Sequence, residues 1–305
     1  MQALAHRFNG VFTALITPFK DGGVDYVAYD ALVERQIEAG IAGLVPVGTT
    51  GEAATLSDDE ADALIERTVG LVAGRALVMA GAGANDTSKT IEKVKRAERA
   101  GADAVLIVTP YYNKPTQAGL LAHYGAAAQA TTLPVMLYSV PGRCGVEISP
   151  ETCAALVGRH ENIIAIKEAG GSAARVTQLR GACGDRLIIH SGDDGLTLPF
   201  LSLGAVGVTS VVANVAPREM VQLVEAWTRG DTARALALHE LIAELTDSMF
   251  IESNPGPVKA ALALSNLAGP EMRLPMVPVS QANRERIAGI LGRFTSASAA
   301  FQEMR

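Results

Sequence analysis

The chain has 305 residues and a net charge of −6, from 26 Lys and Arg against 32 Asp and Glu. This acidic balance argues against nucleic acid as a partner, because neutralising phosphates needs a basic surface. No apolar stretch is long enough to span a bilayer, and the N-terminal segment lacks a signal core with a cleavage site. The three cysteines form no CxxC pair and favour a reducing compartment. We therefore expect a cytoplasmic protein that binds neither nucleic acid nor membranes.

Short strand-like runs alternate with helical patterns through most of the chain. The runs are bounded by Gly, Pro, Asn or Asp and cover residues 12–17, 43–47, 76–80, 104–109, 134–140, 163–168, 187–191 and 207–212. Helical patterns cover residues 25–39, 57–72, 86–100, 117–130, 149–159, 172–182, 195–203 and 217–229. Such alternation predicts parallel βαβ units of the α/β class. Eight strands close most simply into a (β/α)8 TIM barrel, with a doubly wound sheet as the alternative.

More helix follows the eighth unit, at about residues 231–251, 257–267 and 280–299. This part contains no strand pattern, so it is not a further βα repeat. We therefore predict a catalytic barrel over residues 1–230 and a C-terminal helical subdomain over residues 231–305, packed on the barrel.

Lys167 is the residue that an apolar strand should not contain. Strand alternation places Ile163, Ala165 and Lys167 on one face. Burial of a lysine lowers its pKa and yields the neutral amine that attacks carbonyl groups. In TIM barrels the chemistry lies at the carboxyl ends of the strands, where Lys167 is expected. A structural ion pair, for instance with Glu168, is the alternative that this segment alone leaves open.

Three other segments carry candidate polar groups. The glycines and hydroxyls of Gly-Thr-Thr-Gly-Glu at 48–52 suit an anion such as a carboxylate, or form a plain βα turn. Arg143 follows the fifth strand and is a candidate carboxylate clamp, or a solvated loop residue. Tyr138 and Tyr112 carry phenols that can relay protons, although packing explains an isolated tyrosine equally well.

Metal and nucleotide chemistry find little support. The five histidines show no ligand spacing, and residues 81–86 lack the third glycine of a dinucleotide fingerprint. Asp193 and Asp194 are typical of a helix cap. The sequence also lacks a GxSxG nucleophile elbow.

Five motifs together resemble one family. They are Gly-Thr-Thr-Gly-Glu at 48–52, Tyr-Tyr-Asn-Lys-Pro at 111–115, Leu-Tyr-Ser-Val-Pro at 137–141, Ile-Lys-Glu at 166–168 and Ser-Gly-Asp-Asp at 191–194. Their order and spacing resemble the dihydrodipicolinate synthase and N-acetylneuraminate lyase family from about residue 12 to residue 279. Arg143, Asn-Pro-Gly-Pro-Val-Lys at 254–259 and Arg-Leu-Pro-Met at 273–276 resemble the synthase branch.

The resemblance implies a lyase in which Lys167 holds pyruvate as a Schiff base. The derived enamine would attack L-aspartate 4-semialdehyde and give 4-hydroxy-tetrahydrodipicolinate, for lysine and diaminopimelate biosynthesis. The implied proton relay is Thr49, Tyr138 and Tyr112, the last from a neighbouring subunit. The implied substrate-binding residues are Thr50, Gly51, Gly192 and Val208 (through its backbone) for pyruvate and its surroundings, and Arg143 for the semialdehyde carboxylate. The resemblance implies no metal and no organic cofactor, and a homotetramer built as a dimer of dimers.

The chain departs from the family pattern at two places. Ser139 stands where asparagine is usual. In the pattern for feedback inhibition by lysine, the positions that match are Ala54, Asn85 and Tyr111, whereas Asp58 and Ala61 replace histidines and Lys89 replaces a glutamate. A cation where the ligand's own amine would bind repels it. We therefore expect weak inhibition by lysine or none.

Two other functions remain open at this point. The first keeps the Schiff base and cleaves sialic acid or a 2-keto-3-deoxy sugar acid, which Arg143 argues against and Ser139 leaves open. The second is a non-catalytic ligand-binding barrel, which the intact set of Thr49, Tyr112, Tyr138 and Lys167 argues against.

Overall fold

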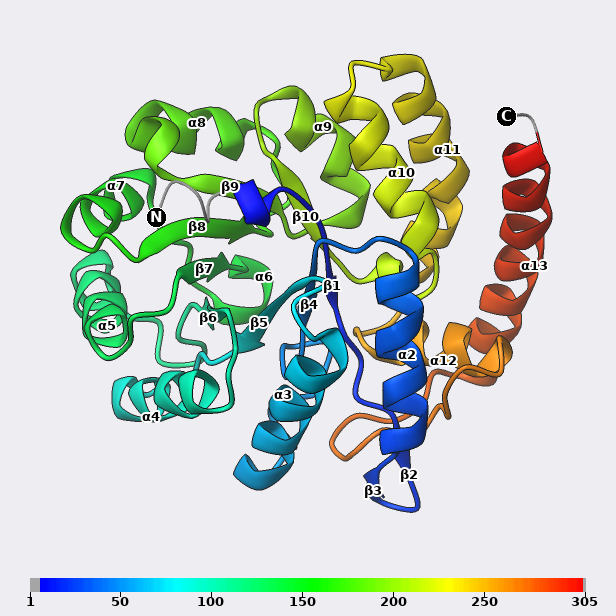
Figure 1. Cartoon of the computed structure of the whole chain (residues 1–305), viewed down its shortest axis with the longest axis horizontal. Coiled ribbons are helices and arrows are strands. Elements are labelled where there is room, and N and C mark those ends of the chain that lie inside the picture. Colours follow the sequence, from blue (N-terminus) through cyan, green and yellow to red (C-terminus); the bar gives the residue numbers. More distant parts are fainter. Residues whose placement is uncertain (1–5, 304–305) are drawn as a thin grey trace.

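A closed barrel of parallel strands forms the centre of the molecule (Figure 1). The computed structural model describes residues 6–303, and in this part eight strands make up the barrel: β1 (Gly10–Ala14), β4 (Gly43–Val45), β5 (Leu77–Gly81), β6 (Ala104–Val108), β7 (Val135–Ser139), β8 (Ile163–Glu168), β9 (Ile188–Ser191) and β10 (Gly207–Ser210). β1 pairs with both β10 and β4, and the others pair in chain order. This closure confirms the predicted (β/α)8 barrel and rules out the doubly wound sheet.

Helices alternate with the strands and cover the outside of the barrel (Figure 1). They are α2 (Tyr26–Glu38), α3 (Asp58–Val72), α4 (Thr87–Arg99), α5 (Gln117–Gln129), α7 (Pro150–Arg159), α8 (Ala174–Cys183), α9 (Thr197–Ser202) and α10 (Pro217–Thr228). Their bounds agree closely with the predicted ones, because capping residues mark the starts. The Ser57 hydroxyl accepts from the Glu60 N–H at 3.2 Å, and the Glu60 carboxylate accepts from the Ser57 N–H at 2.9 Å.

Several short elements were not predicted. They are the hairpin of β2 (Phe19–Lys20) and β3 (Gly23–Val24), the one-turn helix α6 (Pro141–Cys144), and the 3-10 turns η1 (His6–Phe8), η2 (Gly184–Arg186), η3 (Asp194–Leu196) and η4 (Val212–Asn214). Elements this short show no hydrophobic period in a sequence.

Alternate residues of the strands fill the barrel interior, because successive side chains of a strand point to opposite faces. The inward apolar side chains of the strands are Phe12, Val45, Leu77, Met79, Ala104, Leu106, Met136, Tyr138 and Ala165. His190 crosses this interior: Nε2 donates to the Phe8 carbonyl at 2.5 Å, and Nδ1 accepts from the Thr209 hydroxyl at 3.1 Å. Burial lowers the pKa of His190 to about 4, so this ring is neutral and structural.

An irregularity at the start of β8 corrects one prediction. Val135 pairs with Ile163, but the next residue of β7, Met136, pairs with Ala165, so one residue of β8 is skipped. Ile163 therefore packs in the outer cluster between strands and helices, whereas Ala165 lies in the inner one. The prediction that Ile163 shares a face with Ala165 and Lys167 is wrong, because the irregularity breaks the alternation.

In the part of the chain that the structure describes, three helices follow the barrel: α11 (Thr232–Ser248), α12 (Gly256–Leu264) and α13 (Gln281–Glu303). α11 packs against α10, and α13 packs against α11 and α12 at the edge of the molecule (Figure 1). Leu238, Ile242 and Leu245 of α11 belong to the same apolar cluster as the outer faces of the strands. The helical C-terminal extension is thus confirmed. The division after residue 230 stays a prediction, and the outermost ends of both predicted parts lie outside the described residues.

Among residues 6–303, no helix combines the length and apolar composition needed to cross a membrane. The three cysteines are buried and free of disulfides, as expected. Residues 1–5, on which part of the N-terminal prediction rests, lie outside the described residues.

We expect Ser57→Ala to lower the free energy of unfolding by about 1 kcal/mol, because the Glu60 N–H loses its acceptor. Chemical denaturation checks this. Ser296→Ala is the control, since its hydroxyl donates to the Gly292 carbonyl in the exposed middle of α13. The control should change stability by less than about 0.5 kcal/mol. Equal stability of Ser57→Ala and the unmodified protein would contradict the role of the capping box.

Candidate active site

Lys167 lies near the carboxyl end of β8 with its side chain in the barrel interior, where it is only 5 % exposed. Small residues make room for it. Ala165 precedes it on the same face, and a Cβ atom added at Gly192 would come within 3.0 Å of Lys167 Cγ and Cε. A larger residue at position 192 would therefore displace the lysine. The structure places Gly192 against Lys167, while its substrate-binding role stays a prediction.

Burial lowers the pKa of Lys167 to about 8, and the Arg143 guanidinium adds to the lowering. The Asp194 carboxylate acts in the opposite direction. Asp194 is itself held in place, because its Oδ2 accepts from the N–H groups of Val211 at 2.9 Å and Val212 at 3.2 Å. At pH 7 about one amine in ten is then neutral, which is the nucleophilic form.

Tyr138 lies opposite Lys167 in the register of β7 and β8, and the lysine Nζ is 4.5 Å from the centroid of its ring. Burial raises the pKa of the Tyr138 phenol, which Arg143 and the Thr49 hydroxyl partly offset. A phenol kept protonated beside an amine can pass a proton to or from a reacting group. The structure therefore brings together Lys167, Tyr138, Thr49 and Arg143.

The loop of residues 48–52 is fixed from two sides. The Gly51 carbonyl accepts from the Thr17 hydroxyl at 2.8 Å. The Thr50 hydroxyl accepts from Nδ2 of Asn254 at 3.0 Å. Thr50 and Gly51 are buried, whereas Gly48, Thr49 and Glu52 of the same loop line the cavity described next.

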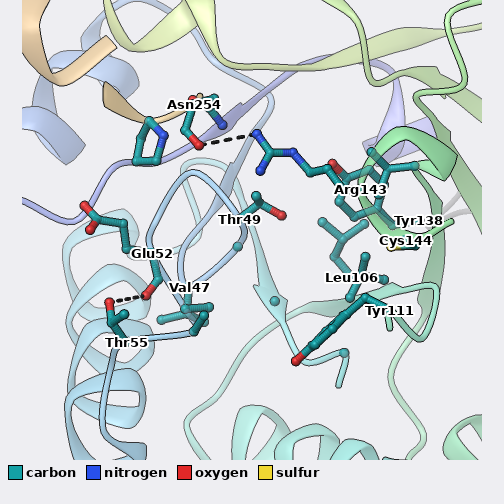
Figure 2. A pocket seen from close by; sticks show the side chains of 18 of the residues that line it. Val47, Thr49, Glu52, Thr55, Leu106, Tyr111, Tyr138, Arg143, Cys144 and Asn254 are labelled. Atoms are coloured by element: carbon teal, nitrogen blue, oxygen red, sulfur yellow. Dashed lines mark hydrogen bonds between the residues drawn. The ribbon is translucent and has the colours of Figure 1, made fainter. Parts of the chain in front are cut away.

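A cavity of about 390 Å³ lies over the carboxyl ends of the strands (Figure 2). Thr49, Tyr138 and Arg143 line it from the barrel, and Asn254 lines it from the C-terminal part. Arg143 projects from α6 across the cavity, and its Nη2 donates to the Asn254 carbonyl at 3.3 Å (Figure 2). Asn254 thus contacts both Thr50 and Arg143. Sequence reasoning used Asn254 only as part of a motif, and its contacts with the site were missed.

Two predicted site residues lie elsewhere in this chain. Tyr112 is 88 % exposed, with φ +73°, and its side chain does not reach the cavity. Val208 has its side chain in the outer cluster, and the inward residue beside it on β10 is Thr209. The roles of Tyr112, from a neighbouring subunit, and of Val208, through its backbone, stay predictions.

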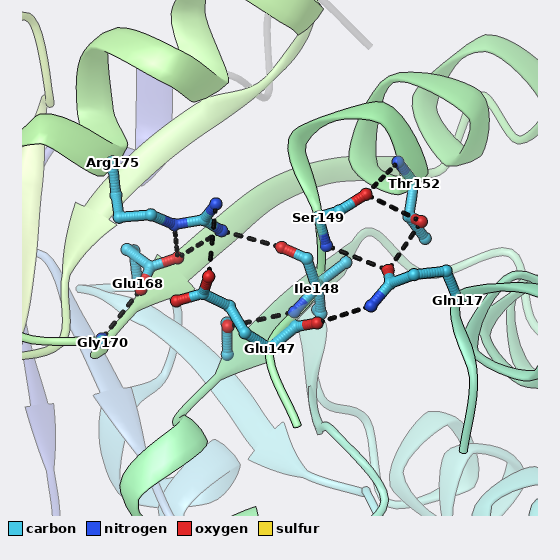
Figure 3. Close-up of polar contacts among 9 residues, drawn as sticks. Gln117, Glu147, Ile148, Ser149, Thr152, Glu168, Gly170 and Arg175 are labelled. Carbon is cyan, nitrogen blue, oxygen red and sulfur yellow. Dashed lines mark hydrogen bonds and ion pairs between the residues drawn. The ribbon is translucent and has the colours of Figure 1, made fainter. Parts of the chain in front are cut away.

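Glu168 points away from Lys167, to the outer side of β8 (Figure 3). Its Oε2 lies 3.2 Å from Nη2 of Arg175, and its Oε1 accepts from the Gly170 N–H at 2.8 Å. Arg175 also donates to the Ile148 carbonyl at 2.7 Å. The alternative explanation of Lys167, an ion pair with Glu168, is therefore wrong.

Ser139 belongs to this outer network as well. It is fully buried, lies opposite Glu168 in the sheet, and its Oγ accepts from the Ile148 N–H at 3.5 Å. Its side chain therefore stabilises the connection after β7 and does not line the cavity. The replacement of asparagine by serine at this position gives no support to a sugar-acid substrate.

Four residues of the lysine-inhibition pattern line the cavity or a pocket beside it. Ala54 and Tyr111 line it, and the Asn85 carbonyl accepts from Asn113 Nδ2 at 2.7 Å. Asp58 and Ala61 line a smaller adjoining pocket. Lys93, on the same helix as Lys89, lines both pockets. This region therefore carries a cation beyond the one that the pattern comparison singled out.

Known proteins share both the sequence and this architecture. The model of the Dihydrodipicolinate synthetase family matches residues 7–293. The chain belongs to this family. One relative, a 4-hydroxy-tetrahydrodipicolinate synthase from Magnetococcus marinus, is 50 % identical over 92 % of this chain and 96 % of its own length. Family membership confirms the resemblance seen in the motifs.

Solved structures of family members match the fold closely. The 4-hydroxy-tetrahydrodipicolinate synthase of Methylacidiphilum fumariolicum SolV superimposes with a TM-score of 0.95 at 46 % identity, covering 97 % of this chain and 99 % of that one. Another, described as the first monomeric dihydrodipicolinate synthase variant, has a TM-score of 0.93 at 41 % identity, covering 96 % and 98 %.

Within residues 6–303, no cluster of three or more His, Cys, Asp or Glu side chains is arranged to hold a metal ion. The expectation that the reaction needs no metal or organic cofactor stays a prediction.

We expect the reactivity of Lys167 towards acetic anhydride to rise with pH and level off with a midpoint near 8, because only the neutral amine reacts. Competitive labelling with peptide mass spectrometry measures this midpoint. In Asp194→Asn the midpoint should fall, because the carboxylate that stabilises the ammonium is gone. A midpoint near that of an ordinary lysine in the unmodified protein would contradict the buried, neutral amine.

Proposed function

We propose that this chain is a 4-hydroxy-tetrahydrodipicolinate synthase, which condenses pyruvate with L-aspartate 4-semialdehyde. The observation that carries the proposal is the buried Lys167, whose pKa of about 8 and position beside Tyr138 suit imine formation. Family membership over most of the chain supports the same reaction. Lysine and diaminopimelate biosynthesis in the cytoplasm is the corresponding biological role.

The first half of the reaction uses pyruvate alone. The neutral amine of Lys167 attacks the ketone, and loss of water leaves an iminium ion. The iminium accepts the electron pair of a methyl C–H bond, so the proton leaves and an enamine forms. Tyr138 and Thr49 would carry these protons, since both line the cavity and the Tyr138 ring lies against the amine. Thr50 and Gly51 would hold the pyruvate carboxylate.

In the second half the enamine carbon attacks the aldehyde and forms the new carbon–carbon bond. Arg143 would bind the carboxylate of the semialdehyde, because its guanidinium lines the cavity and is close enough to Lys167 to lower the pKa of the amine. The substrate's amine then adds to the imine carbon and displaces Lys167, which closes the ring and frees the enzyme. The reaction consumes no oxidant, reductant or cofactor.

Tyr112 would complete the proton relay from a neighbouring subunit. Its large exposed phenol and its φ of +73° suit a side chain held out from the surface towards a partner. We therefore propose a homotetramer, with each site completed within a tight dimer. One similar structure is described as a monomeric variant, so the number of subunits in this protein has to be measured directly. Sedimentation equilibrium gives the mass of the assembly.

The second candidate is a pyruvate lyase for sialic acid or a 2-keto-3-deoxy sugar acid. Arg143 argues against it, because a guanidinium in the cavity suits the carboxylate of the semialdehyde better than a polyhydroxy chain. Ser139, which had left this candidate open, lies outside the cavity.

The deciding measurement is the turnover of pyruvate with L-aspartate 4-semialdehyde. We expect rapid turnover that falls at least about a thousand-fold in Lys167→Ala, because the covalent route is lost. Glu219→Gln, on α10 and not among the residues that line the cavity, serves as the matched variant and should keep full activity. Pyruvate trapped by borohydride on Lys167 without turnover of the semialdehyde would keep the chemistry and direct the search to sugar acids.

Lysine at millimolar concentration should leave the activity nearly unchanged, because Lys93 lines both pockets, Lys89 lies on the same helix, and positive charge there repels the amine of the ligand. Initial rates with and without lysine measure this. In Lys89→Glu we expect inhibition to appear or to strengthen. Strong inhibition of the unmodified enzyme at micromolar lysine would contradict the expectation.

A further inference from the structure

A second buried lysine, Lys259 of α12, plays no part in the chemistry described so far. Its side chain is fully buried and forms an ion pair with Glu52, whose side chain is 3 % exposed. Lys259 Nζ also donates to the Glu271 carbonyl at 2.8 Å and lies 4.3 Å from the centroid of the Phe19 ring. With acceptors on several sides, this ammonium is not a free nucleophile.

Glu52 is held equally firmly. Its other carboxylate oxygen, Oε2, accepts from the main-chain N–H of Arg273 at 3.2 Å. The Arg273 side chain in turn binds both oxygens of Glu60, at 2.7 and 2.6 Å, and donates to the Thr55 carbonyl at 3.0 Å. The network therefore joins the C-terminal part to the start of α3 and to the end of the loop before it.

Buried ion pairs of this kind contribute little net stability, because desolvation offsets the attraction. What the Glu52–Lys259 pair does fix is geometry. Glu52 has φ +54°, an unfavourable conformation for a residue with a side chain, and it directly follows Gly51. Such a conformation persists only where the surroundings hold it. Here the contacts of the Glu52 carboxylate with Lys259 and Arg273 hold it.

The loop that this pair anchors is the one proposed to bind the pyruvate carboxylate. Glu52 closes the Gly-Thr-Thr-Gly-Glu turn, and its side chain faces α12. From the same C-terminal segment, Asn254 donates to the Thr50 hydroxyl at 3.0 Å. Asn254 and Lys259, two residues of one segment, thus contact neighbouring residues of the loop. On the other side, the Thr17 hydroxyl donates to the Gly51 carbonyl.

We propose that Lys259, through its buried ion pair with Glu52, is a positioning residue that sets the Thr49–Thr50–Gly51 loop for the carboxylate of the first substrate. Lys259 touches neither the amine of Lys167 nor the cavity, so it acts through the loop. The inference rests on the proposed function only in taking a 2-keto acid as the compound that the loop binds.

The test uses pyruvate alone, so it does not depend on which aldehyde follows. Borohydride trapping of pyruvate on Lys167 is measured against pyruvate concentration in the full-length protein. The variant is the double substitution Glu52→Gln with Lys259→Met, which removes both charges and leaves neither unpaired. We expect the half-saturating pyruvate concentration to rise at least tenfold, with trapping still complete at saturation and the pH midpoint of Lys167 labelling still near 8.

A merely structural role predicts a different result. The double variant would then melt at a lower temperature but bind pyruvate with unchanged half-saturation, and this outcome would overturn the proposal. Glu219→Gln, which changes the buried contact with Ser298 between α10 and α13, is the matched control and should leave half-saturation unchanged. If the double variant does not fold, Glu52→Asp carries the comparison, because it keeps both charges and shortens the reach of the carboxylate to Lys259, with an expected rise of at least threefold. Failure of the unmodified protein to trap pyruvate would instead overturn the proposed function itself.

Discussion

The site depends on keeping one lysine amine inside an apolar barrel without fixing it as an ammonium. Desolvation drives the pKa of Lys167 down, while Asp194 holds it up near 8. The balance needs a carboxylate that is near but engaged elsewhere, and the main-chain N–H groups of Val211 and Val212 engage it. It also needs room, which Gly192 supplies. A full ion pair at this position would remove the nucleophile, and complete isolation would make the lysine too costly to bury.

Much of this arrangement could be predicted from the order of the residues. The barrel followed from eight alternating units, because hydrophobic period and capping residues are local properties. Lys167 stood out because a charge interrupts a buried strand. The irregularity that turns Ile163 outward could not be read from the sequence, since it arises from pairing between β7 and β8. Contacts between segments far apart in the chain were equally hidden, as Asn254 with Thr50 shows.

Two buried ion pairs flank the site, and Glu52 is the one of their four residues that also lines the cavity. Glu168 with Arg175 braces the outer side of β8 and the connection that follows β7, while Glu52 with Lys259 braces the loop after β4. Apolar residues could pack at both places without the cost of desolvating charges. The two ion pairs therefore serve to orient the segments that they join more than to stabilise the fold. The catalytic side chains themselves make few strong contacts, which leaves them free for substrate. Rigidity is thus supplied by neighbouring residues that take no part in the proposed chemistry.

The C-terminal contacts that anchor the loop after β4 are made late in the synthesis of the chain. Residues 48–52 leave the ribosome early, but Asn254 and Lys259 follow some two hundred residues later. The barrel can close once β10 has emerged and paired with β1, and at that stage this loop still lacks its anchors. A growing chain would therefore carry its lysine nucleophile in place and yet hold keto acids poorly. The chain would gain the ability to bind keto acids tightly only when its C-terminal segment packs on the barrel.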